Sequence, residues 1–156
     1  MDFDAGAAIV AGLVGGSAMG VLLYMGIGMM PNQMKMNLFL MLGTMMIEDK
    51  KMTYVAGAMI HGAMSIAFGV VHAALYVALG LETDLIAWGL LFGLAHWAVT
   101  GIGLGMLPVM HPVMKRGGMA APGAFAMRYP PMTAMGFLML HILFGVLVGA
   151  TYGALV

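Results

Sequence analysis

The chain has 156 residues, of which 63% are apolar and 8% charged, and its mean hydropathy is +1.03. Soluble domains are roughly 45–50% apolar and about 25% charged, so this composition indicates a membrane protein. A net charge of zero and the lack of cysteine exclude a nucleic-acid-binding surface, disulfides and thiolate metal sites.

Four apolar stretches are long enough to cross the membrane as helices, which takes about 20 residues. They cover residues 5–30, 53–80, 84–108 and 132–156. The first follows two aspartates rather than a basic segment, so we expect a retained span and not a cleaved signal peptide. Residues 32–46 are too few to span, and we expect an interfacial amphipathic helix there, with a re-entrant segment as the alternative. Residues 111–131 are rich in Pro and Gly and predict an irregular loop.

The basic residues predict the orientation of the spans. All six lie in the first and third connections: Lys35, Lys50, Lys51, Lys115, Arg116 and Arg128. Short loops rich in Lys and Arg stay in the cytoplasm. We therefore expect a multi-pass protein of a prokaryotic cytoplasmic (inner) membrane, with both termini outside.

The two halves of the chain resemble each other. A shift of 77 places residues 11–31 on 88–108, and both segments end in Gly-x-Gly-Met-x-Pro. A shift of 80 places residues 52–61 on 132–141. We interpret this as a duplicated helical hairpin, about 5–80 and 84–156, within a single transmembrane domain of residues 1–156. Chance matching of glycine-rich apolar text is the alternative.

This interpretation predicts an all-α polytopic bundle of four transmembrane helices, built as two tandem parallel-related hairpins. Their pseudo-twofold axis lies along the membrane normal. Each Gly-x-Gly-Met-x-Pro phrase is expected to end its helix. Glycines spaced four apart in the first and last spans predict close helix packing, within the bundle or in a homodimer.

Four of the five histidines fall inside spans, where ionisable residues are functional candidates by default. The repeat pairs His61 with His141, each about 12 Å above the cytoplasmic boundary of the membrane. It also pairs Met19 with His96, each about 18 Å above that boundary. If these side chains face inward, they form a His, His, His, Met group near the bilayer centre. Imidazole with thioether suits copper(I), and the pair His61 and His141 suits haem b. A neutral histidine hydrogen-bonded across helices is the alternative for each.

Further candidate metal ligands lie outside this group. His72 shares the face of His61 about three turns away, which allows a second level of ligands. Most of the 21 methionines gather toward the cytoplasmic side. The most ligand-like run there holds Met106, Met110, His111 and Met114. Packing, or contact with a partner protein, is the alternative for these methionines.

The order of these features resembles a family of small, uncharacterised bacterial and archaeal four-helix integral membrane proteins, described only as a domain of unknown function. The resemblance lies in "AGLVGGSAMG", "LFLMLG", "IHGAMSIAFGVVHAALY", "GLLFGLAHW" and "LHILFGVLVGATYG". The methionine content and the long loop rich in Pro and Gly depart from the family. The resemblance implies the architecture and carries over no catalytic residue.

No hydrolytic or nucleotide-binding motif is present and no span has a charged residue at its centre, so we expect no enzymatic activity. The leading hypothesis is a non-catalytic accessory subunit of a larger membrane complex, of respiratory or metallo-oxidase type. Its partners are then the lipid bilayer and other membrane subunits or further copies of the chain. The alternative is a copper(I)- or haem-b-binding membrane protein, and a weaker one is a small transporter.

Overall fold

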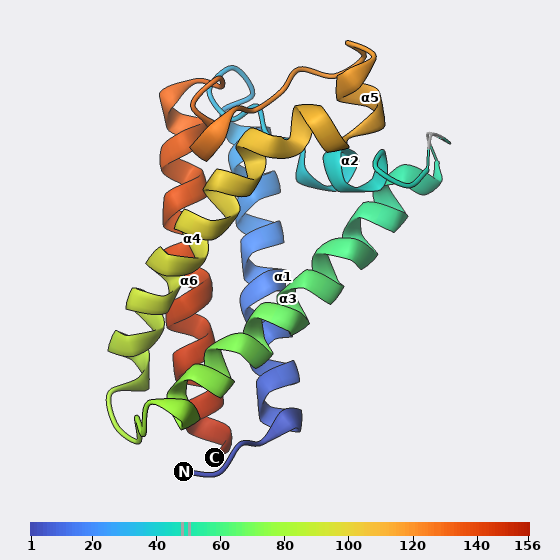
Figure 1. The fold of residues 1–156 in the computed structure, drawn as a ribbon. Helices are drawn as coiled ribbons and strands as arrows, with labels where there is room; N and C mark the ends of the chain where they lie inside the picture. The colour runs from blue at the N-terminus through green and yellow to red at the C-terminus, as the bar shows by residue number, and fades with distance from the viewer. Residues whose placement is uncertain (48, 50) are drawn as a thin grey trace.

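The computed structural model describes residues 1–47, 49 and 51–156, and these residues form an all-α bundle (Figure 1). Its four long helices are α1 (Ala5–Met29), α3 (Met52–Ala78), α4 (Leu85–Met110) and α6 (Pro131–Leu155). Each is long and apolar enough to cross a membrane. The four predicted spans are confirmed to within two residues at each end. The protein is therefore a four-span integral membrane protein.

Three short elements lie in the connections: α2 (Leu38–Gly43), α5 (Pro112–Lys115) and the 3-10 helix η1 (Ala124–Ala126). The predicted helix after the first span is confirmed as α2, which is shorter than residues 32–46. The Asn37 side chain caps it by accepting a hydrogen bond from the Leu40 backbone N–H (3.2 Å). Met41 and Leu42 of α2 are buried, so this helix turns an apolar face toward the bundle.

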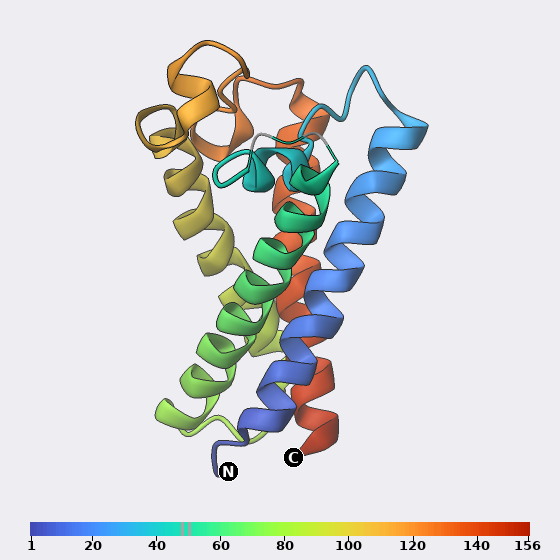
Figure 2. The same cartoon turned by 90° about the vertical axis from the view of Figure 1, so that its right-hand side faces the viewer.

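The helices alternate in direction. α1 and α4 run from the end of the bundle that holds both chain termini toward the end that holds α2, α5 and η1, and α3 and α6 return (Figures 1 and 2). We call these ends the terminal end and the connection end. The first and third spans thus run in the same sense, as predicted. Five of the six basic residues lie in the segments of the connection end, and Lys50 lies outside the described residues. Which end faces the cytoplasm stays a prediction.

The two Gly-x-Gly-Met-x-Pro phrases behave differently. α1 ends at Met29, two residues before Pro31, as expected. Pro108, in contrast, lies inside α4, which continues to Met110. A proline removes one backbone N–H from the helical ladder. The next turn is nevertheless retained here, since the N–H of His111 donates to the carbonyl of Leu107 (2.7 Å). The expectation that both prolines stop their helices was wrong for the second.

Glycine brings the two helices of each hairpin into backbone contact. A Cβ atom added to Gly12 of α1 would collide with the carbonyl oxygen of Ser65 on α3. In the second hairpin, a Cβ on Gly89 of α4 would collide with the carbonyl oxygen of Gly145 on α6. Gly89 lies 77 residues after Gly12, and Gly145 lies 80 residues after Ser65. These contacts therefore follow the two offsets of the sequence repeat.

A second pair of contacts follows the same offsets. A Cβ on Gly69 would meet the carbonyl oxygen of Ala8 at 2.7 Å, and one on Gly149 would collide with that of Leu85. The two hairpins thus cross in the same way, which supports the predicted duplication.

The contacts between the hairpins are not symmetric. α1 packs against α6 over much of its length, whereas α3 and α4 have few contacts. Gly15 of α1 lets the ring of Phe144 approach its backbone, so that a Cβ there would lie 2.8 Å from that ring. The matching position of α4 is Phe92, whose ring contacts those of His72 and Tyr76 on α3 (centroids 5.8 and 5.3 Å apart). The Phe92 ring therefore separates α3 from α4, whereas the equivalent Gly15 allows α1 and α6 to pack closely.

We predict that Gly89→Val destabilises the bundle by about 3 kcal/mol or more, because the new side chain collides with the backbone of α6. Gly103→Val is the matched control, since a Cβ on Gly103 meets nothing within 4 Å. Thermal unfolding in detergent, followed by circular dichroism, measures both. Equal unfolding midpoints for the two variants would contradict the packing described here.

Candidate functional site

A cavity of about 440 Å³ lies inside the bundle, between α3 and α4. Its walls come from all four spans and from the segment that contains α2. Met19, His61, His96 and His141 all line it. The structure therefore brings the four residues of the predicted His, His, His, Met group to one cavity.

His61 lines the cavity from α3. Its Nε2 lies 3.0 Å from the backbone carbonyl oxygen of Gly16 on α1 and donates a hydrogen bond to it. A neutral imidazole has one N–H, so Nδ1 of His61 carries a lone pair. The side chain is half-buried, and it also lines a groove on the outer face of α1 and α3. His61 thus links α3 to α1 through a hydrogen bond, and its Nδ1 retains a lone pair.

His141 lines the cavity from α6 and has both ring nitrogens engaged. Its Nδ1 donates to the carbonyl oxygen of Phe137, one turn earlier (2.7 Å). Nε2 of the neutral ring then accepts from the Thr100 hydroxyl on α4 (3.0 Å), which also lies 2.8 Å from the carbonyl oxygen of His96. Both partners are uncharged, so His141 ties α6 to α4 as a neutral group.

His96 lines the cavity from α4, and the described residues give its side chain no hydrogen bond. Its side chain is 92% buried, since only 8% of it is exposed. No partner for its Nδ1 is present among the described residues. The ring instead stacks on Phe68 of α3 (centroids 3.6 Å apart) and meets the ring of His141 edge-on (4.8 Å). Because Nδ1 is enclosed by protein atoms, Nε2 is the ring nitrogen left to meet a molecule in the cavity.

Apolar side chains close the cavity at both ends. Phe68 and Phe144 lie toward the terminal end, and Phe144 is only 1% exposed. Methionines and leucines of the segment around α2 cover the connection end: Met36, Leu38, Met41, Leu42 and Met45. Methionine is flexible and adapts to irregular shapes, so this cover suits contact with a bound molecule. No charged residue lines the cavity in the part of the chain that the structure describes.

The donor set gives limited support to a metal or haem in this cavity. Among residues 1–47, 49 and 51–156, no group of three His, Cys, Asp or Glu side chains is placed to hold a metal ion. His141 has no free nitrogen for coordination, and a haem paired by His61 and His141 would break its bond to Thr100. The propionates of haem would also find no basic residue in the lining. The copper(I) and haem assignments stay predictions.

His72 lies deeper than the cavity, in an aromatic cluster toward the terminal end. It is 2% exposed, and its ring lies edge-on to those of His96 (centroids 6.0 Å apart) and Phe144 (5.6 Å). Its Nδ1 and the hydroxyl of Tyr76 are buried without partners among the described residues. His72 is thus near the cavity histidines but is not part of the cavity lining.

The predicted ligand run after the third span is divided between surface and interior. Met106 and Met110 are exposed, whereas His111 and Met114 are buried. His111 caps α5 by accepting from the Met114 backbone N–H through Nδ1 (3.3 Å), and its Nε2 donates to the carbonyl oxygen of Met41 (2.9 Å). His111 therefore joins α2 to the start of α5, and the structure does not gather these four residues at one point.

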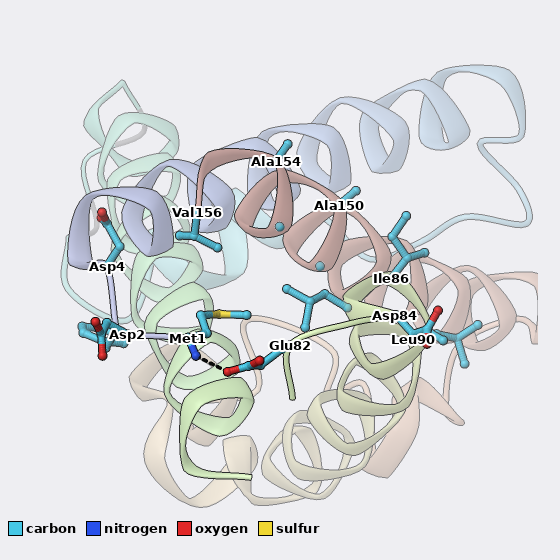
Figure 3. A pocket seen from close by; sticks show the side chains of 15 residues that line it. Met1, Asp2, Asp4, Glu82, Asp84, Ile86, Leu90, Ala150, Ala154 and Val156 are labelled. Atoms are coloured by element: carbon cyan, nitrogen blue, oxygen red, sulfur yellow. Dashed lines mark hydrogen bonds and ion pairs between the residues drawn. The ribbon is translucent and has the colours of Figure 1, made fainter. Parts of the chain in front are cut away.

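A second, larger pocket opens at the terminal end (Figure 3). Asp2, Asp4, Glu82 and Asp84 line it. The Met1 amino group forms an ion pair with Glu82, and this hydrogen-bonded pair raises the pKa of the amino group and lowers that of the carboxyl group. The carboxylate of Asp4 caps α1 by accepting from the Ala7 backbone N–H (2.8 Å). The unpartnered buried groups found in the described residues lie elsewhere, so this pocket is a weaker candidate than the cavity.

No family model, curated protein or solved structure matches this chain. The resemblance to small four-helix membrane proteins is thus supported as a pattern of four membrane spans, and no family is identified.

Sequence analysis missed three side chains that shape the site: Phe68, Phe92 and Thr100. Thr100 lies one helical turn after His96, and Phe68 lies one turn before His72, so helical periodicity places each on the face of a candidate histidine. That signal was available in the sequence. The role of Phe92 depends on which helices separate, and periodicity does not reveal that.

Proposed function

We propose that this integral membrane protein binds a small, mainly apolar molecule inside its bundle and acts without catalysis. The observation that supports this most is the cavity, which collects His61, His96, His141 and Met19. Small-molecule sites are cavities of about 300–1,000 Å³ with apolar walls and a few polar groups, often between the helices of a bundle. The volume of about 440 Å³ falls in that range.

His96 is the residue that we assign to the polar group of the bound molecule. Nδ1 of this ring is enclosed by protein atoms, so a ligand in the cavity would pair with Nε2. His61 and His141 hold the walls through Gly16 and Thr100, so they position the site.

Purification from native membranes in mild detergent tests this proposal. We expect a defined small molecule in the organic-solvent extract, detected by mass spectrometry at near one equivalent. A Soret band or stoichiometric copper in its place would support the haem or copper(I) alternative instead. A preparation that contains neither a molecule nor a metal would contradict binding.

We predict that His96→Phe loses the bound molecule and still folds. Phenylalanine keeps the stack on Phe68 and removes the unpartnered nitrogen, so the unfolding midpoint of the ligand-free protein should rise, by the equivalent of about 1–3 kcal/mol. Met59→Leu is the control because Met59 is 70% exposed on α3 and should keep the ligand. Retention of the molecule by His96→Phe would contradict the assigned role.

A second candidate is the accessory subunit of a larger membrane complex, and a groove of about 470 Å³ on α1 and α3 favours it. Small residues line this groove: Gly16, Ser17, Gly20, Ala58 and Gly62. The repeat matches Ser17, Gly20 and Gly62 to Leu94, Trp97 and Ile142, so large side chains occupy the corresponding positions of the second hairpin. The occupant that suits the first hairpin is therefore a transmembrane helix of another subunit with large apolar side chains.

We predict that Ser17→Trp fills this groove and releases the chain from its complex. Native gel electrophoresis of membranes solubilised in mild detergent measures the assembled mass. Wild type and the control Val99→Trp, which alters an exposed position on α4, should migrate together above the monomer. A monomeric wild type, or a Ser17→Trp variant that stays assembled, would contradict the subunit role.

A further inference from the structure

The route into the cavity and the polar atoms along it define the class of molecule that fits. This inference rests on the proposed ligand-binding function. Three features of the cavity matter: its uncharged lining, the protons carried by the ring nitrogens of its three histidines, and the exposed residues between α3 and α4.

The lining selects a neutral molecule. Among the residues that the structure describes, this lining contains no Lys, Arg, Asp or Glu. A charged group buried in this cavity would have no opposite charge, and unpaired charges are costly to move out of water. A neutral molecule with a long apolar part avoids that cost.

The hydrogen bonds among the lining residues indicate that the bound molecule carries a hydrogen-bond acceptor. The N–H groups of His61 and His141 are used by Gly16 and Phe137, and the Thr100 hydroxyl proton is shared between Nε2 of His141 and the carbonyl oxygen of His96. His96 has one N–H to place, and its Nδ1 is buried without a partner. Orphaned N–H groups are rarer in proteins than under-satisfied acceptors, so the proton belongs on Nε2. That N–H is the donor that His96 offers, and a carbonyl-type oxygen is its matching partner.

The route leads to the lipid rather than to water. Phe144 and the methionines around α2 close the two ends of the cavity. Met64 of α3 and Gly103 of α4 line the cavity and are also exposed at the surface of the bundle. A Cβ on Gly103 would meet nothing within 4 Å, so space lies beside it. Since α3 and α4 have few contacts, the opening lies between them at membrane depth.

We infer that the cavity takes up a neutral, membrane-dissolved molecule with a carbonyl-type acceptor, which enters from the bilayer between Met64 and Gly103. The acceptor bonds to His96, and the apolar part lies among the methionines. Gly103 lies in the gap, so a larger residue there slows the passage of the molecule.

A benzoquinone with a ten-carbon tail is a suitable probe, because it has carbonyl oxygens and quenches tryptophan fluorescence. The chain has two tryptophans, Trp88 and Trp97, to report binding. Stopped-flow quenching of the purified, delipidated protein in detergent gives both rate constants. Decylbenzene, which has a similar tail and no acceptor, tests the carbonyl requirement by competition.

We predict that Gly103→Phe lowers the association rate constant by about tenfold, because the ring narrows the entrance. Gly62→Phe is the matched control: a Cβ there also meets nothing within 4 Å, but Gly62 lines the outer groove and not the cavity. It should bind at wild-type rates. If Gly103→Phe does not fold, Gly103→Leu provides a smaller obstruction with the same expected direction.

The outcomes separate the two levels of the proposal. Saturable quenching with unchanged rates in Gly103→Phe, or an equal slowing in Gly62→Phe, would overturn the route alone. Displacement of the quinone by equimolar decylbenzene would overturn the carbonyl requirement. A wild-type protein that shows no saturable quenching, and that carries no molecule from native membranes, would overturn the ligand-binding function itself.

Discussion

Backbone contact at glycine positions sets the arrangement of the four spans. In lipid no hydrophobic effect pulls helices together, so close packing and backbone approach must supply the association. Gly12 and Gly69 allow this approach between α1 and α3, and Gly89 and Gly149 allow it between α4 and α6. Each of these crossings is tight enough that an added Cβ would press on the backbone of the facing helix. The two hairpins are therefore rigid units, and the space inside the bundle depends on how they meet.

The two contacts between the hairpins, α1 with α6 and α3 with α4, are unequal. One pair of matched positions accounts for the difference. Gly15 lets Phe144 of α6 close onto α1, whereas Phe92 stands between α4 and α3. The stack of Phe68 on His96 adds a second ring between the same two helices. A symmetric bundle would have two equivalent contacts between hairpins. This one replaces the second contact with a cavity, and the polar side chains within it come from both hairpins.

Much of the fold could be predicted from the sequence, because length and hydropathy determine spans and the loop charges are segregated. The grouping of Met19, His61, His96 and His141 also followed from equal depth in two matched hairpins. The chemistry of these side chains could not be predicted, because it depends on which ring nitrogens carry protons and on their hydrogen-bond partners. Sequence spacing specifies neither. Both nitrogens of His141 are engaged by Phe137 and Thr100, whereas Nδ1 of His96 has no hydrogen-bond partner among the described residues. Whether the residues from Met106 to Met114 share one site was still harder to predict. This run continues around a helix and then turns at His111, so its side chains face different ways.

The apolar cavity that α3 and α4 enclose next to His96 can be tested directly. Xenon under pressure binds to empty apolar cavities and can be located directly in a crystal structure of the ligand-free protein. We expect a xenon site between α3 and α4, bordered by Phe68, His96 and Phe144. A structure in which α3 packs directly on α4, with no xenon in the bundle interior, would contradict it.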